Sequence, residues 1–208
     1  MCPPVADWDD VFLRQERRYA GAQSAVLRGN AAYGAALAQL MLGDHDHAAE
    51  WLEKSVAAYR ESWVDAPPDS WGRPIAAMKA RLLVGKAADD EARWALDAGA
   101  DDAQSSIGRY AAALAHLVLG DDDRARVHAD AIRTRDDFPR AVGDAVAMIA
   151  AGTDAVGYVE AVEAVLESFE TRDEYLEDVA VADTVLVLQA LAEQRGLRAD
   201  LNSALLPG

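Results

Sequence analysis

The sequence is poor in several residues that define common protein classes. It has a single cysteine, Cys2, which can form no internal disulfide and has no neighbouring cysteine for a zinc site. It has three phenylalanines and few isoleucines, so β-strands are disfavoured. No apolar run approaches the roughly 18 residues that span a bilayer. The opening residues, MCPPVADWDD, lack the basic and apolar regions of a secretory signal, so we expect a cytoplasmic location.

Positive charge is also scarce. Lys and Arg together number 20 against 36 Asp and Glu, which gives a formal charge of -16, and only Lys54, Lys79 and Lys86 are lysines. Contacts to nucleic-acid phosphates and to anionic lipid surfaces require clustered basic residues, so neither a nucleic acid nor a membrane is expected as a partner. The acidity fits a halophilic, high-salt cytoplasm or a high-GC genome, and both explanations stay open.

Alanine and leucine are abundant, and 51% of the 208 residues are hydrophobic, enough to bury a core. Residues 33–44, YGAALAQLMLGD, recur almost unchanged as residues 110–121, YAAALAHLVLGD. Leucines at helical spacing beside small alanines predict helices that pack closely. The closing Gly-Asp predicts a left-handed helix end followed by an Asp-capped helix. The fold class predicted is all-α.

Glycine and proline breaks divide the chain into about ten to eleven antiparallel helices. We expect one domain over residues 1–208, made of an N-terminal helix (1–29), helical-hairpin repeats (30–195) and a C-terminal cap (196–208). The expected helices span residues 7–27, 33–42, 44–63, 71–84, 89–98, 108–119, 121–134, 139–152, 154–172, 174–195 and 200–206.

Pairs of helices recur every 30 to 45 residues or so, which is typical of a solenoid. The glycines that separate them are Gly43, Gly85, Gly120, Gly152 and Gly196. Over most of residues 30–195 this layout resembles the tetratricopeptide (TPR) family. Where that family has a small residue five positions after the inter-helix glycine, this chain has Ala48 and Ala125. Where it has a large residue four positions further on, this chain has Leu52 and Trp94.

The chain also departs from that family. Its tryptophan, its leucine-glycine pair and its closing proline are missing at their expected spacing, and Asp90 and Ala129 stand at the small and large positions. The resemblance to a TPR-like superfamily with degenerate repeats implies a right-handed superhelix whose concave side is lined by the first helix of each pair. It also implies binding without catalysis. On that side it places Tyr33, Arg73, Lys79, Arg109, Tyr110 and His116.

One helix carries an acidic edge. Glu160, Glu163, Glu167 and Glu170 fall on one side of the helix expected over residues 154–172. A solvated face opposite an apolar stripe explains this spacing, and a docking surface for a basic partner is the alternative. The stripe consists of Val162, Val165, Leu166 and Phe169.

Histidines offer the only candidates for metal chemistry. Of His45, His47, Asp46 and Glu50, only His47 and Glu50 have the spacing that places two ligands on one helical face. We interpret that group as a helix cap with exposed histidines.

His116 and His128 lie in the two helices of one hairpin and could approach each other, but no nucleophile accompanies them. We interpret them as packed histidines. No metal site, no catalytic residue and no cofactor is predicted.

Three hypotheses about function follow from these patterns. The first is a non-enzymatic scaffold, monomeric or a weak homodimer, that binds a protein or peptide on its concave face. The second is an acidic immunity or inhibitor-type protein that masks a basic toxin or nuclease, as the charge of -16 on a small helical chain suggests. The third is a helical-bundle enzyme or metal protein that uses some of its four histidines.

Overall fold

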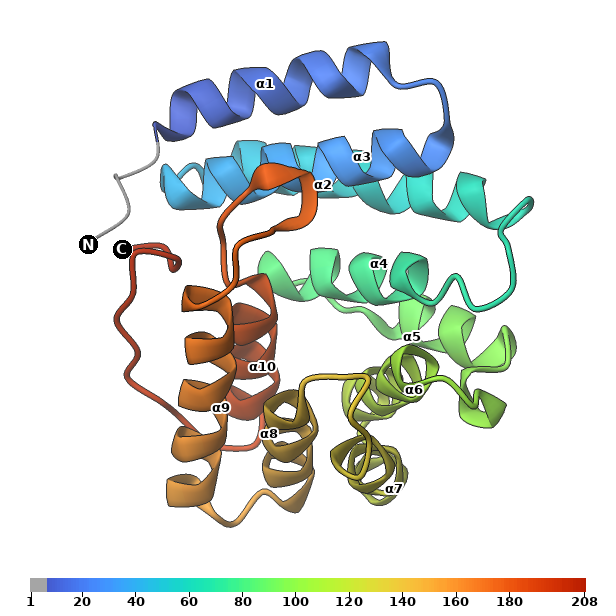
Figure 1. The fold of residues 1–208 in the computed structure, drawn as a ribbon, viewed down its shortest axis with the longest axis vertical. Helices are drawn as coiled ribbons and strands as arrows, with labels where there is room; N and C mark the ends of the chain where they lie inside the picture. Colours follow the sequence, from blue (N-terminus) through green and yellow to red (C-terminus); the bar gives the residue numbers. More distant parts are fainter. Residues whose placement is uncertain (1–6) are drawn as a thin grey trace.

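A computed structural model describes residues 7–208, and this part of the chain contains helices and no strands (Figure 1). The all-α prediction is confirmed. Cys2 lies outside the described residues. The helices are α1 (Trp8–Gly21), α2 (Ala25–Met41), α3 (His45–Trp63), α4 (Gly72–Leu83), α5 (Asp89–Asp97), α6 (Ser106–Leu119), α7 (Asp122–Arg133), α8 (Arg140–Ala151), α9 (Ala155–Glu170) and α10 (Asp183–Glu193), with short 3₁₀ helices η1 (Ala100–Asp102) and η2 (Leu176–Asp178). The seven helices from α3 to α9 begin and end within two residues of the predicted positions.

The repeated segment forms the same turn twice. Gly43 and Gly120 follow α2 and α6 with φ values of +77° and +75°. The next residues, Asp44 and Asp121, each donate their backbone N–H over 2.9 Å to the carbonyl five residues back. Their carboxylates then accept from the N–H three residues on, at 3.1 and 3.2 Å, and so cap α3 and α7. The Gly-Asp pair therefore sets both hairpin turns, as the sequence predicts.

Replacing Gly120 with alanine should lower the free energy of unfolding by about 1 kcal/mol, because a Cβ is strained at positive φ. Gly21→Ala is the matched control, since that glycine ends α1 with no positive φ and with open space around the added Cβ. It should be neutral or slightly stabilising. Urea denaturation of both variants measures the difference, and an equal effect of the two would contradict this account of the turn.

The predicted N-terminal helix over residues 7–27 is wrong. The chain leaves α1 at Gly21 and begins α2 at Ala25, because Ser24 is extended and its hydroxyl caps the N–H of Leu27. Gly29, the last residue of the predicted N-terminal segment (1–29), lies inside α2. A Cβ there would come within 2.9 Å of the Tyr59 ring on α3, so this glycine permits close packing between helices.

The predicted helix over residues 174–195 is also wrong in its first half, since α10 begins only at Asp183. The preceding residues 171–182, which we call the crossing loop, extend from α9 to α1. There the Glu177 carbonyl accepts from Gln15 at 2.8 Å and from Arg18 at 2.7 Å. Glu177 itself has a positive φ of +55°. In a helix this carbonyl would accept a hydrogen bond from a backbone N–H. Here the side chains of α1 satisfy it instead.

The predicted final helix over residues 200–206 does not form. The C-terminal segment instead forms irregular structure and a turn, and it is bonded to α10 and to the residue before it. The carbonyl of Leu205 accepts from the N–H of Ala182 at 2.9 Å, and the carbonyl of Ala199 accepts from Gln189 at 3.1 Å. The segment still covers the end of the helical array. It does so through these two hydrogen bonds and through the buried side chains of Leu205 and Leu206.

α4 lies between two hydrophobic clusters. Ala77 and Ala80 belong to the cluster built with α1–α3, whereas Ile75 and Met78 belong to the cluster built with α5–α10. α10 packs against α4 as well as against its neighbours α8 and α9 (Figure 1). The hairpins therefore curl until the last helix meets the fourth, whereas in an open solenoid each repeat contacts only its neighbours.

Candidate functional site

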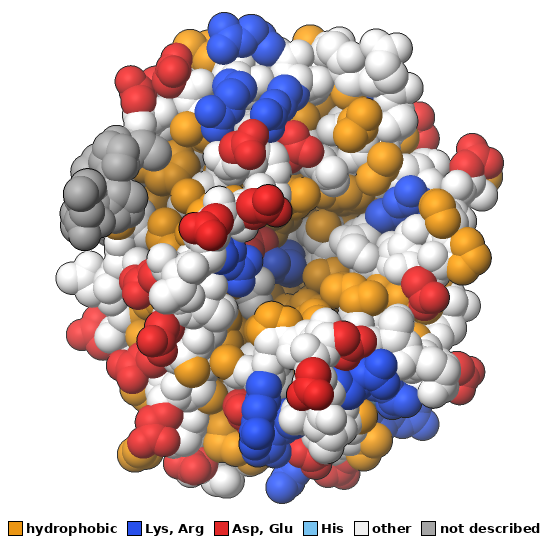
Figure 2. Space-filling model, viewed as in Figure 1, with side chains coloured by type: hydrophobic (Ala, Val, Ile, Leu, Met, Phe, Trp, Pro, Cys, Tyr) orange, Lys and Arg blue, Asp and Glu red, His pale blue; other side chains and the backbone are white. Residues whose placement is uncertain are grey.

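A cavity of ≈ 190 Å³ is bounded by α2, α4, the end of α9, the crossing loop and the start of α10. It opens in the middle of the face in Figure 2, where basic side chains lie in the hollow among hydrophobic ones. Its apolar wall includes Leu37, Phe169, Val179 and Val181. We call it the central cavity.

The polar side of the central cavity is a closed network. Lys79 Nζ lies 2.5 Å from Asp183 Oδ2 and donates to Thr184 Oγ1 at 2.9 Å. The Tyr33 hydroxyl donates to Asp183 Oδ2 at 2.8 Å. Burial, followed by the negative charge of Asp183, raises the pKa of Tyr33 well above its usual value, so this hydroxyl stays protonated. The charges at this wall therefore neutralise one another.

Arg172 forms another part of the wall. Its guanidinium carbon lies 3.6 Å from the centre of the Phe169 ring, and its Nε donates to the Ser168 carbonyl at 3.1 Å. Leu176, at the rim, is 53% exposed. Two acidic residues of the crossing loop, Asp173 and Glu174, are exposed beside this rim. The rim thus combines the apolar Leu176 and the positive Arg172 of the wall with two exposed carboxylates of the same loop.

The structure separates the residues predicted for a concave binding face. Tyr33 and Lys79 line the central cavity, whereas Arg73, Arg109, Tyr110 and His116 are not among its lining residues. Arg73 donates to the Ser62 carbonyl at 2.8 Å, and Arg109 bonds the side chain of Gln104 at 3.4 Å.

Tyr33 and Tyr110 are equivalent in the repeat but differ in environment. Tyr110 is buried against the Phe138 ring, with ring centres 5.3 Å apart, and its hydroxyl has no hydrogen-bond partner within residues 7–208. Burial, with a smaller effect of Asp183, raises its pKa. Tyr33 therefore lines the central cavity, whereas Tyr110 packs in the larger hydrophobic cluster.

The acidic edge lies where the sequence places it. Glu160, Glu163, Glu167 and Glu170 are all exposed, and the apolar stripe on the same helix is buried. In the described part of the chain none of these four carboxylates forms an ion pair. Glu170 accepts a hydrogen bond from Ser203 at 2.6 Å. The edge is thus a solvated face with unneutralised charge.

His47 pairs with the cap of its own helix. Its Nδ1 lies 2.7 Å from Asp44 Oδ2, and this hydrogen bond is the main cause that raises the pKa of His47. The equivalent position in the second copy is Arg124, whose Nε lies 3.5 Å from Asp121. In the first copy the capping aspartate therefore pairs with a histidine, whose charge changes with pH. In the second copy it pairs with an arginine, which stays charged.

This difference predicts a pH dependence. Because the folded pKa of His47 is raised, its stabilisation is present below the unfolded value of about 6.5 and is lost as pH rises through the folded value. His47→Arg keeps the cation at all these pH values. The variant should therefore gain stability relative to the wild type as pH rises from about 6 to about 8. Urea midpoints across this range test it, and a constant difference would contradict it.

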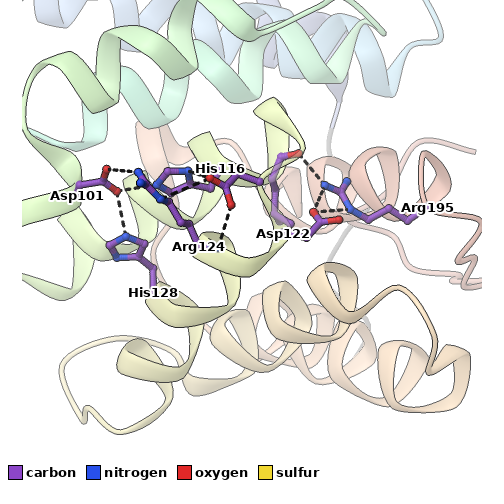
Figure 3. Close-up of polar contacts among 8 residues, drawn as sticks. Asp101, His116, Asp122, Arg124, His128 and Arg195 are labelled. Carbon is purple, nitrogen blue, oxygen red and sulfur yellow. Dashed lines mark hydrogen bonds and ion pairs between the residues drawn. The ribbon is translucent and has the colours of Figure 1, made fainter.

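His116 and His128 do approach each other across their hairpin. Their rings stack at 5.7 Å between centres with an interplanar angle of 10°. The Nε2 atoms of both lie close to a single oxygen, Asp101 Oδ1, at 2.6 and 3.1 Å (Figure 3). Burial lowers the pKa of His128 despite the carboxylate, and the two histidines lower the pKa of Asp101 although burial opposes it. Asp101 lies in η1, a turn in which no sequence pattern indicates a metal ligand.

Comparison with known proteins identifies one partial match. The family described as "Domain of unknown function (DUF6340)" matches residues 5–82, which is less than half of the chain. That region includes α1–α3 and most of α4, with Tyr33 and Lys79, but not Asp183. The chain matches no curated protein. It also matches no solved structure. Within residues 7–208, no helix combines the length and apolar character needed to cross a membrane.

Proposed function

We propose that this protein is a non-enzymatic, TPR-like helical-hairpin protein that binds a protein or peptide at the central cavity. The observation that carries the proposal is the cavity itself, with an apolar wall beside a charge network that is already neutralised. Drug-sized ligands and cofactors usually occupy about 300–1,000 Å³. A cavity of ≈ 190 Å³ instead fits one anchoring side chain of a longer segment.

The TPR-like assignment is supported by the hairpins. The α2–α3 and α6–α7 pairs share one turn geometry, and Ala48 and Ala125, at the family's small position, are both fully buried. Buried alanines at that position let the two helices of a pair approach closely. The return of α10 to α4 gives this array a more closed form than an open superhelix.

The absence of catalysis is also part of the proposal. Asp183, Lys79, Tyr33 and Thr184 bond to one another at the cavity, so each already has a partner. A nucleophile in a working site is instead paired with a general base and left open to substrate. The arrangement at the central cavity supports binding better than chemistry.

The partner's chemistry follows from the mouth of the cavity. Arg172 in the wall is positive, but Asp173 and Glu174 of the same loop are exposed and the whole chain carries a charge of -16. We expect a segment with an apolar anchor flanked by Lys or Arg, because complementary charge steers association. Binding should weaken with added salt, while the apolar anchor retains part of the affinity.

A peptide-display selection against the full chain tests the proposal. Leu176→Trp adds a large side chain at the rim of the cavity, whereas Val64→Trp adds the same group at a site that is 85% exposed and does not line it. Selected peptides should bind the Leu176 variant at least about 10-fold more weakly than the wild type, and the Val64 variant equally well. Peptides that bind all three proteins alike would refute the central cavity as the site.

The acidic edge supports a second candidate, an immunity or inhibitor-type protein that masks a basic toxin or nuclease. Its four exposed glutamates have no ionic partner within residues 7–208. Changing all four to glutamine should then reduce binding of a basic partner steeply and flatten its salt dependence, while Leu176→Trp has no effect. If Leu176→Trp weakens binding and the four glutamine substitutions have little effect, the result favours the central cavity instead.

A further inference from the structure

Asp101, His116 and His128 form a cluster that the central cavity does not include. Their side chains offer three ligand atoms, all within 4.8 Å of one another. The residues come from three elements, η1, α6 and α7. The turn after α5 and both helices of the next hairpin therefore meet at this point (Figure 3).

We propose that this cluster is a binding site for a divalent transition-metal ion, with Zn²⁺ as the cation that its ligands fit best. Two imidazoles and a carboxylate are three of the four ligands of a common tetrahedral zinc site, and water supplies the fourth. Imidazole nitrogen disfavours Mg²⁺ and Ca²⁺, which select oxygen ligands. The site is separate from the proposed peptide-binding function and does not depend on it.

The geometry favours a metal ion over simple packing. Both Nε2 atoms converge on the same oxygen, Asp101 Oδ1, at 2.6 and 3.1 Å, so the three ligands are already directed at one point. Small movements would admit a cation at the usual zinc distance of about 2.0–2.2 Å from each ligand. When each Nε2 coordinates the ion, the single proton of each neutral ring lies on Nδ1.

The environment of the Nδ1 atoms supplies an independent observation. His128 Nδ1 is buried and has no hydrogen-bond partner within residues 7–208, so its ring is held by its Nε2 contact and by packing. His116 Nδ1 lies 3.9 Å from Asp121 Oδ2. This distance is longer than a hydrogen bond, and a small shift of either side chain would form the carboxylate–histidine contact that orients ligating rings at many zinc sites.

Access to the site is from the side of Asp101. The side chain of Asp101 is 36% exposed, whereas those of His116 and His128 are 3% and 9% exposed. Arg124 Nη1 lies 3.5 Å from Asp101 Oδ2 and its Nε lies 3.5 Å from Asp121 Oδ2, while its side chain is 64% exposed. Arg124 is therefore a positive charge that opposes the cation, which gives the proposal a distinctive test.

The experiment is calorimetric titration of ZnCl₂ into the full chain after removal of metal with a chelator. The wild type should bind one Zn²⁺, and MgCl₂ should give no binding. Asp101→Asn and His128→Gln should each weaken zinc binding at least about 10-fold. His47→Gln is the matched control, since it removes an exposed histidine outside the cluster, and should leave this site unchanged.

Arg124→Gln should tighten zinc binding, a result that a merely structural histidine pair would not give. With Co²⁺ as the probe, the wild type should show the intense visible absorption of four-coordinate cobalt, and Asp101→Asn should lose it. Zinc at about 100 times its Kd should raise the wild-type Tm by roughly 5–10 °C.

Absence of stoichiometric zinc binding by the wild type would overturn the proposal. So would equal binding by the wild type, Asp101→Asn and His128→Gln, since the ion would then be elsewhere. Circular dichroism establishes that each variant is folded. If His128→Gln does not fold, Asp101→Asn and Arg124→Gln still decide the question, because they are predicted to change zinc affinity in opposite directions.

Discussion

Replacing Asp183 with alanine is expected to lower the free energy of unfolding by about 3–5 kcal/mol. The change leaves the ammonium of Lys79, a residue that is 8% exposed, without its anionic partner, and leaves the Tyr33 hydroxyl without its acceptor. A buried charge without a partner costs more than the pair contributes when intact. The pair also joins α4 to α10, so the effect should extend to the contact between these helices.

Urea denaturation measures this cost, with Asp173→Ala as a control at an exposed aspartate of the crossing loop. The control should change stability by no more than about 0.5 kcal/mol. The double variant Lys79→Met with Asp183→Leu should recover at least about 2 kcal/mol relative to Asp183→Ala, since no buried charge remains. A loss below about 1 kcal/mol for Asp183→Ala would show that Lys79 is not held as described.

Leu114→Ala should cost more than Leu37→Ala, although the two leucines are equivalent in the repeat. Leu114 is completely buried in the larger hydrophobic cluster, whereas Leu37 lines the central cavity. Truncation of Leu114 leaves a void in a packed core, for which we expect a loss of about 4 kcal/mol. Truncation of Leu37 enlarges a cavity that already opens to solvent, for which we expect about 2 kcal/mol.

The same denaturation experiment tests both variants, with the m-value as a check that the unfolded reference is unchanged. Equal losses would mean that the two copies of the repeat are packed alike. That outcome would remove the distinction between a copy that forms a core and a copy that lines a binding cavity.

Local signals in the sequence were sufficient for most of the fold. The Gly-Asp pairs predicted both hairpin turns, because Gly43 and Gly120 can adopt positive φ and the next aspartates can cap a helix. Glycine and proline breaks, with capping aspartates and apolar spacing between them, predicted α3 through α9 within two residues. These features depend on residues a few positions apart, so a single chain reveals them.

The errors arose where distant contacts decide the conformation. Residues 174–182 have the apolar content of a helix, but Gln15 and Arg18 of α1 bind the Glu177 carbonyl and hold the segment as a loop. Gly29 resembles a helix stop, yet its role is to admit the ring of Tyr59. No local pattern distinguishes these cases, because the partner lies on another helix.

The candidate sites divide in the same way, into residues that local patterns predict and residues that only distant contacts bring together. Tyr33 and Lys79 were predicted to lie on a binding face because the repeat placed them on first helices, and both line the central cavity. Asp183 was missed because it lay inside a predicted helix with no polar signal. The approach of His116 to His128 was foreseen from the hairpin, but the third ligand, Asp101, comes from a preceding turn whose position only the fold determines.

Hydrogen–deuterium exchange with and without a selected peptide would test the central claim most directly. If the central cavity binds the peptide, protection should appear in the crossing loop, at the start of α10 and beside Tyr33, with little change in the first two turns of α9. Protection of α9 around Glu160 and Glu163, with no change in residues 171–184, would contradict the central cavity and favour the acidic edge as the binding surface.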